Sequence, residues 1–139
     1  MNLRRKIAVL VSTLALSVSG GVLAAPPAAA DEPCASTKLC LYRSTLFRTM
    51  ELSTGSVSNC WWLEDYNLGD SWSGIKSYRN NLGVKATIWY YDFGSTRWEP
   101  SARATIGVGG FSSDTTYGNH AFAEAEAVCT GSATPQVYL

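Results

Sequence analysis

The four cysteines of this chain all follow an N-terminal segment that has the pattern of a secretory leader. An even number of cysteines in a short exported chain predicts a framework of structural disulfides. Spacing permits three pairings, and we favour Cys34–Cys40 together with Cys60–Cys129. By chain entropy, closing the longer of these loops stabilises a fold by roughly 4 kcal/mol and closing the shorter by roughly 2 kcal/mol. Two covalent crosslinks therefore constrain the fold before any strand is assigned.

The leader predicts where the folded domain starts. Basic residues precede an apolar run and then a stretch rich in alanine, which is the order of segments in a signal peptide. Cleavage after Ala24 or after Ala30 satisfies the preference for small residues at the cleavage site, and we favour Ala30. Residues 1–30 are then the signal peptide, and residues 31–139 form a single secreted, extracellular domain with its core between residues 34 and 129.

Size and charge restrict the class of protein. A domain of about 110 residues buries roughly 65% of the surface that its unfolded chain exposes, which is enough for one hydrophobic core. Without the three basic residues of the leader, 8 basic and 11 acidic side chains remain, a net charge of −3. A nucleic-acid-binding protein needs a clustered excess of Lys and Arg, so we do not expect one. No later apolar stretch approaches the roughly 20 residues of a transmembrane span, and we expect a soluble monomer.

The mature sequence has the pattern of an all-β protein. Short runs alternate between apolar and polar residues or are rich in β-branched and aromatic residues, and clusters of Gly, Ser, Asn and Asp separate them. Strands at this spacing predict a sandwich or barrel. The last run also fits one or two turns of helix. The predicted strands are Lys38–Arg43, Thr49–Ser53, Ile75–Arg79, Val84–Tyr91, Arg97–Glu99, Ala102–Val108 and Glu124–Cys129.

The two halves of the chain echo each other at an offset of about 48 residues. In the first half Tyr42 follows an apolar residue and precedes Glu51 by nine positions, and in the second half Tyr90 precedes Glu99 by the same distance. A duplicated strand motif explains this echo. Because one unit of four strands cannot bury its apolar face alone, we expect the two copies to share one core.

Residues 40–80 resemble a known motif. The order is Cys40-Leu41-Tyr42, a turn, Met50-Glu51-Leu52, and then residues 66–80, Tyr-Asn-Leu-Gly-Asp-Ser-Trp-Ser-Gly-Ile-Lys-Ser-Tyr-Arg-Asn. This order is similar to a βγ-crystallin Greek-key motif and, more narrowly, resembles the streptomycete metalloproteinase-inhibitor family of small secreted proteins. The resemblance is specific over residues 34–80. It implies an all-β, βγ-crystallin-like double Greek-key sandwich in which two four-stranded motifs intertwine.

The resemblance also implies a function. A member of this family is a secreted peptidase inhibitor, which presents a rigid loop to an extracellular, zinc-dependent proteinase and so loses little chain entropy on binding. A second, glycine-rich loop over residues 107–119 contains Phe111 but is longer and costs more entropy to order. The family leads us to expect a disulfide that braces the reactive loop, yet no cysteine lies between Trp61 and Val128. The preferred inhibitory loop consists of Asp92, Phe93, Gly94, Ser95 and Thr96.

Calcium is the one cofactor that the resemblance suggests, because crystallin-like motifs can hold it with two Asn/Asp residues, two free positions and two hydroxyl residues. In the window 69–74, Asp70 and Ser73 match this pattern, and the first and last positions do not. Calcium requires roughly six to eight oxygen ligands. We therefore expect no cofactor and a structural turn at Asp70, with Asp70 and Ser73 as weak calcium candidates.

Aromatic residues suggest an alternative function. Trp61 and Trp62 follow Cys60, and adjacent strand residues point to opposite faces, so one indole is expected in the core and the other at the surface. With Trp72, the exposed indole could form a platform for sugar rings. The alternative is then a secreted, crystallin-like binding or antimicrobial module that recognises cell-envelope glycan or membrane. The competing explanation is that a small β domain fills its core with aromatic side chains, each of which buries about 150–250 Å².

Residues suited to catalysis are scarce. His120 is the only histidine, and all four cysteines are expected to be oxidised, which disfavours a thiol nucleophile and a zinc site. Glu64 and Asp65 are adjacent in the chain, so they are not expected to flank a glycosidic bond. We expect a binding protein rather than an enzyme, with no catalytic residue.

Overall fold

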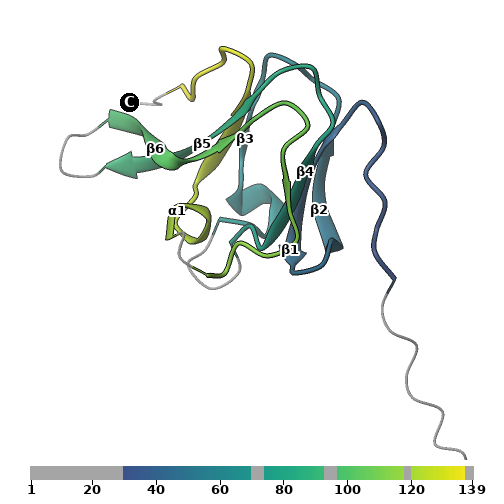
Figure 1. The fold of residues 1–139 in the computed structure, drawn as a ribbon. Coiled ribbons are helices and arrows are strands. Elements are labelled where there is room, and N and C mark those ends of the chain that lie inside the picture. Colours follow the sequence, from purple (N-terminus) through teal and green to yellow (C-terminus); the bar gives the residue numbers. More distant parts are fainter. Residues whose placement is uncertain (1–29, 70–73, 93–96, 118–119, 137–139) are drawn as a thin grey trace, which may run out of the picture.

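The structure, a computed structural model, describes residues 30–69, 74–92, 97–117 and 120–136. These residues form two antiparallel sheets of four strands each with two short helical turns (Figure 1). The chain is therefore all-β, as its alternating sequence predicts. The elements are β1 (Leu39–Ser44), β2 (Arg48–Thr54), β3 (Cys60–Trp62), η1 (Glu64–Tyr66), β4 (Ser77–Asn80), β5 (Ala86–Asp92), β6 (Arg97–Ile106), β7 (Phe111–Ser112), α1 (His120–Ala123) and β8 (Ala127–Thr130).

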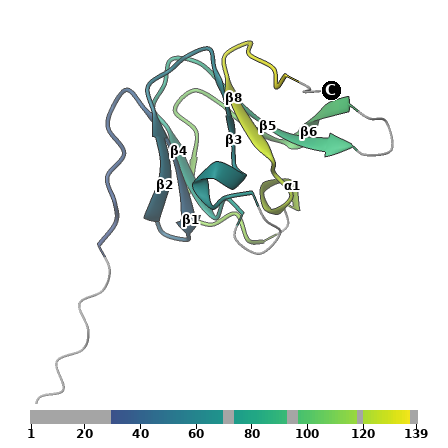
Figure 2. The same cartoon turned by 180° about the vertical axis from the view of Figure 1, so that it is seen from behind.

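Each sheet takes three strands from one half of the chain and one strand from the other half. Sheet A has the order β2-β1-β4-β7, and sheet B has the order β6-β5-β8-β3. The two orders correspond strand for strand, with β3 and β7 exchanged between the halves. Figures 1 and 2 show the resulting interleaved arrangement from opposite sides. Neither half completes its sheet without a strand from the other, which is a physical reason for the two halves to fold together.

The main hydrophobic core contains residues from both sheets. Leu41 of β1, Ile88 of β5 and Val128 of β8 are fully buried in it, and Ile106 of β6 is almost fully buried. Trp61 of β3 packs against the same cluster. Because burial of one large apolar side chain contributes about 1.5–3 kcal/mol, this shared core couples the two sheets energetically.

A second, smaller cluster explains why β1 is buried on both faces. Cys40 and Tyr42, which alternate with the core residues along β1, pack with Phe47 on the other side of sheet A. The segment before β1 covers this side: the Tyr42 hydroxyl donates to the carbonyl of Glu32 at 2.9 Å, and Cys34 is joined to Cys40. The N-terminal segment is thereby held against the sheet, so strict alternation of exposure is lost in β1.

The four cysteines form the two disulfides favoured from the sequence. Cys34–Cys40 closes a short loop, with Cα atoms 5.9 Å apart, and Cys60–Cys129 joins residues 69 positions apart in sequence, with Cα atoms 4.1 Å apart. Cys60 and Cys129 lie directly opposite each other in the β3–β8 ladder. The three-residue strand β3 is therefore fixed covalently to β8.

The strand predictions are correct for the longer elements and wrong in three places. The runs at 97–99 and 102–108 are one strand, β6, which continues through Pro100 because an edge strand tolerates a proline. The run predicted from Glu124 begins only at Ala127, after the helical turn α1. Strands β3 and β7 were not predicted, since three and two residues show no periodicity.

Both helical elements are short. The turn η1 ends at Asn67, whose backbone has a left-handed φ of 53° and whose N–H donates to the Glu64 carbonyl, a common way to end a helical turn. In the part of the chain that the structure describes, no helix is long and apolar enough to cross a membrane.

Candidate functional site

The preferred inhibitory loop closes the hairpin between β5 and β6. Asp92 is the last residue of β5 and pairs with Arg97, the first residue of β6. Residues 93–96, which include Phe93, lie outside the described residues. The loop is thus a four-residue connection whose two ends are joined by strand pairing, within the usual length of hairpin loops.

The outer part of this hairpin projects beyond the body of sheet B. Strand β8 pairs with β5 only as far as Trp89, whereas β6 pairs with β5 from Ala86 to Asp92. The last residues of β5 therefore have one neighbouring strand instead of two. Figure 1 shows this end of the hairpin extending away from the two sheets. The sequence predicts the connection but not its projection, because the projection depends on where β8 stops.

Glu126 holds β5 at the point where it leaves the sheet. Its backbone N–H donates to the carbonyl of Trp89 at 2.9 Å, and its carboxylate accepts a hydrogen bond from the backbone N–H of Tyr91. Burial is the largest effect on the pKa of Glu126 and raises it, the Tyr91 hydrogen bond lowers it, and the negative charge of Glu64 raises it. Sequence analysis missed Glu126, since nothing in its alanine-rich surroundings indicates these contacts.

The glycine-rich alternative loop is well held over its described residues. Asn80 is fully buried, its backbone N–H donates to the carbonyl of Gly110 at 2.8 Å, and its carbonyl accepts from the N–H of Gly109 at 2.9 Å. Gly109 has a φ of 70°, a conformation that glycine adopts without strain. This turn exposes Val108 (63%) and Phe111 (71%). These hydrogen bonds thus offset part of the conformational entropy that the loop is expected to lose when it becomes ordered.

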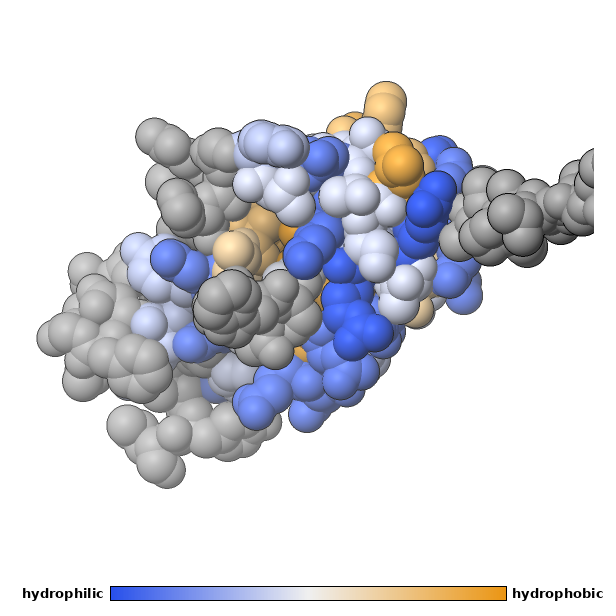
Figure 3. Space-filling model, turned by 90° about the horizontal axis from the view of Figure 1, so that it is seen from below, coloured by the Kyte–Doolittle hydropathy of each residue, from blue (hydrophilic) through white to orange (hydrophobic). Residues whose placement is uncertain are grey.

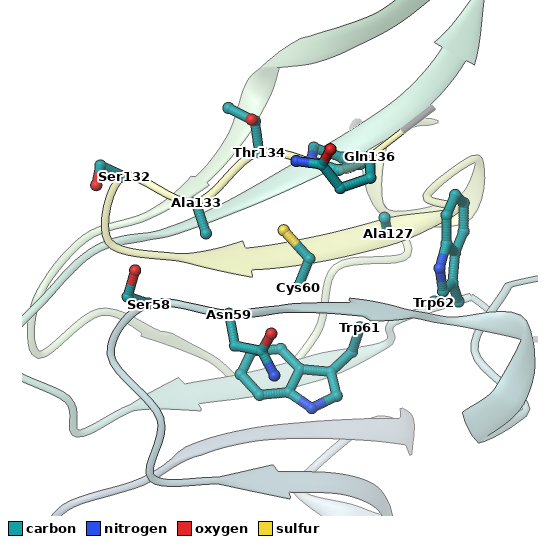
Figure 4. Close-up of a pocket in the computed structure, with 11 residues that line it drawn as sticks. Ser58, Asn59, Cys60, Trp61, Trp62, Ala127, Ser132, Ala133, Thr134 and Gln136 are labelled. Carbon is teal, nitrogen blue, oxygen red and sulfur yellow. The ribbon is translucent and has the colours of Figure 1, made fainter. Parts of the chain in front are cut away.

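The adjacent tryptophans lie on opposite sides of β3, as the sequence predicts. Trp61 packs against the main core, and Trp62 is 37% exposed. Figure 4 shows Trp62 and Cys60 on the side of β3 that faces the C-terminal segment, with Trp61 on the other side. Trp72, the third aromatic candidate, lies outside the described residues.

A groove of about 450 Å³ runs beside β3 and is bounded by Trp62. Cys60 of β3 and Ala127 of β8 line it, and the C-terminal segment 132–136 forms the opposite wall (Figure 4). Sequence analysis did not predict this groove, because it depends on the C-terminal segment folding back over the sheet.

A smaller hollow of about 210 Å³ also borders Trp62. Glu64, Gly69 and Glu126 line it together with the indole. The exposed tryptophan is therefore shared by a larger groove and by a hollow with two carboxyl side chains.

The remaining candidate residues concern metal binding and catalysis. Within the described ranges, no group of three or more His, Cys, Asp or Glu side chains is placed to hold a metal ion. Asp70 and Ser73, the calcium candidates, lie in the segment 70–73, which the structure does not describe. His120 begins α1, and Glu64 and Asp65 are exposed on η1.

Figure 3 shows the molecule from below, and the residues that the structure describes on this face are mainly hydrophilic. Figure 3 shows that the apolar residues described on this face form separate spots rather than one continuous patch. A large apolar patch is the usual mark of a protein or membrane interface. The residues described on this face do not form such a patch.

Comparisons with protein-family models, curated proteins and solved structures found no significant match.

Proposed function

We propose that the protein is a secreted peptidase inhibitor, and that the β5–β6 hairpin presents residues 92–96 to the cleft of an extracellular, zinc-dependent proteinase. The observation that carries this proposal is the projection of the hairpin: beyond Trp89, β5 pairs with β6 alone. A two-stranded element that projects beyond its sheet is suited to entering a cleft. Phe93 gives the loop an apolar side chain for a hydrophobic subsite.

Strand pairing and Glu126 replace the disulfide that inhibitors of this kind would be expected to have. The pairs Asp92↔Arg97 and Tyr91↔Trp98 fix the two ends of the loop, and the carboxylate of Glu126 holds the backbone of Tyr91. A loop whose ends are fixed before binding loses less conformational entropy in the complex than a free peptide does. The peptide bond that the loop presents to the proteinase would accordingly stay in place, and cleaved product would not be released.

The fold that we propose is a double Greek key of the βγ-crystallin type. The support is the correspondence between the orders β2-β1-β4-β7 and β6-β5-β8-β3, with one strand of each half exchanged. The sequence echo at about 48 residues agrees with this correspondence. Secretion is supported by the leader pattern and by two disulfides, since disulfides persist mainly in oxidising compartments.

A titration with variants tests which loop makes the contact. The purified mature chain is titrated against a thermolysin-like zinc peptidase, and residual peptidase activity is measured. Phe93→Ala is expected to weaken inhibition at least about tenfold, equivalent to about 1.4 kcal/mol. The matched control is Phe111→Ala, which removes an aromatic side chain that is 71% exposed on the glycine-rich turn. If Phe111→Ala abolishes inhibition and Phe93→Ala does not, the glycine-rich turn is the contact and the hairpin assignment is wrong.

The alternative function, recognition of cell-envelope glycan, is favoured by the exposed Trp62 beside a groove. The two functions do not exclude each other. The groove lies at the β3 edge of sheet B, and the hairpin is formed with β6 at the opposite edge. One molecule can therefore offer both surfaces.

A further inference from the structure

We propose that the groove between β3 and the C-terminal segment binds a neutral polysaccharide chain, with the indole of Trp62 stacked against a sugar ring. This site is separate from the inhibitory hairpin, and binding at it does not require that the protein inhibit a peptidase. The groove volume of about 450 Å³ lies within the roughly 300–1,000 Å³ of small-molecule sites.

The lining of the groove matches the chemistry of a neutral sugar. Every described residue that lines it is uncharged, and Ser58, Ser132 and Thr134 carry hydroxyl groups while Gln136 carries an amide. Hydroxyls and amides both donate and accept hydrogen bonds, which suits ligands whose hydroxyl groups do the same. A charged ligand would lose its hydration there without gaining an opposite charge.

Trp62 supplies the apolar component of the site. It is 37% exposed at the end of the groove, and a flat aromatic surface with a polar N–H suits ligands that have one apolar and one polar face. The register places Ala127 directly between Trp62 of β3 and Trp89 of β5. Because alanine is small, the side chain of this cross-strand neighbour covers little of the indole.

The neighbouring hollow restricts the charge of the polysaccharide. Glu64 and Glu126 line the hollow on which Trp62 also borders. A polyanionic chain that continued past the indole would meet these carboxyl groups, and like charges repel. Neutral chains are therefore favoured over acidic ones.

The binding experiment uses the full mature chain and two neutral probes, chitin and cellulose, with the hexasaccharides of each for calorimetry. Binding to at least one of them is expected, with little change between low and high salt because no ion pair forms in the groove. The proposal is overturned if the protein is retained on neither polymer and calorimetry detects no binding at millimolar hexasaccharide. Binding that disappears at high salt also overturns it, since charge would then be the cause.

Variants locate the site. Trp62→Ala is expected to weaken binding at least about tenfold, with partial recovery in Trp62→Phe. Ser132→Arg, which places a long charged side chain in the groove, is expected to abolish binding even if Trp62→Ala folds poorly. The matched control is Tyr117→Ala, which removes an aromatic side chain that is 89% exposed elsewhere. Unchanged binding in both Trp62→Ala and Ser132→Arg overturns the assignment.

A truncation tests whether the chain itself occupies the groove. The C-terminal residues 137–139 follow Gln136 directly, so they are the competing occupant. A variant that ends at Gln136 is expected to bind the hexasaccharide as the full chain does. A rise of tenfold or more in its affinity would show that the tail competes with the polysaccharide for the groove. Loss of binding in this variant would show that residues 137–139, and not the groove residues, carry the binding, and would overturn the assignment. In all variants except those of the hairpin, peptidase inhibition is expected to stay unchanged.

Discussion

Asn80, the last residue of β4, joins this strand to two other backbone segments, and its substitution is the sharpest test of how the fold is held together. The side chain is fully buried. Its Nδ2 donates to the carbonyls of Val84 at 2.9 Å, Gly107 at 3.0 Å and Ile106 at 3.3 Å, and its Oδ1 accepts from the N–H of Leu82 at 3.1 Å. One amide therefore contacts four backbone groups, two in the connection between β4 and β5 and two at the end of β6.

Asn80→Ala removes all of these contacts, in which the two N–H groups of the amide serve three carbonyls and the amide oxygen accepts from one backbone N–H. At a net contribution of roughly 1 kcal/mol for each of these three side-chain groups, the expected loss in the free energy of unfolding is about 3 kcal/mol. The loss is measured by guanidinium unfolding at neutral pH. A loss below about 1 kcal/mol would refute the reasoning, because water or neighbouring groups would then replace the amide.

Asn80→Asp keeps the shape of the side chain and changes only its donors. A carboxylate at this position points an oxygen at three carbonyl oxygens, so burial and these acceptors raise the pKa of the new carboxyl group above its unfolded value of about 3.9. A group whose pKa is raised on folding is most favourable below the unfolded pKa and loses stability as pH increases. As the pH rises from about 4 to neutral, the free energy of unfolding of Asn80→Asp should therefore fall relative to that of Asn80→Ala. Equal pH dependence in the two variants would contradict the assigned hydrogen-bond directions.

Three further predictions concern the crosslink, the core and the base of the hairpin. Replacing Cys60 and Cys129 together by alanine opens a loop of 69 residues and is expected to lower the free energy of unfolding by about 4 kcal/mol. Guanidinium unfolding measures this loss, and a loss below about 1 kcal/mol would contradict the prediction. Ile88→Ala removes a fully buried side chain and is expected to cost about 2–5 kcal/mol, measured in the same way, and a cost near zero would mean that Ile88 does not lie in the core. Because the pKa of Glu126 is raised on folding, its ionisation lowers stability as pH rises above the unfolded value of about 4.3. Glu126→Gln, which can still accept from the Tyr91 N–H, should therefore be more stable than the parent protein at neutral pH and not at low pH. Thermal melts at the two pH values measure this. An equal difference in melting temperature at both pH values would contradict the raised pKa.

The sequence was informative where local pattern decides the structure. Alternation predicted the longer strands, and the position of Trp61 and Trp62 on a strand predicted one buried and one exposed indole. The pairing Cys60–Cys129 belongs to the favoured one of the three connectivities that the spacing permits, and the structure places these residues opposite each other in one ladder.

Features that depend on distant segments could not be predicted in this way. Strands β3 and β7 are too short to show a period and exist because each pairs with a strand of the other half of the chain. The projection of the hairpin depends on the end of β8, and the groove depends on the C-terminal segment lying over Cys60. No local signal in the sequence specifies either arrangement.

We propose that a fixed hairpin blocks a peptidase, and an active-site titration tests this proposal most directly. Known amounts of a thermolysin-like zinc peptidase are mixed with increasing amounts of the mature protein, and residual activity and the integrity of the protein are followed together. We predict that activity falls to near zero at one equivalent of protein and that the protein is recovered uncleaved. Full peptidase activity in the presence of excess protein, or rapid cleavage of the chain between Asp92 and Arg97, would contradict the proposed function.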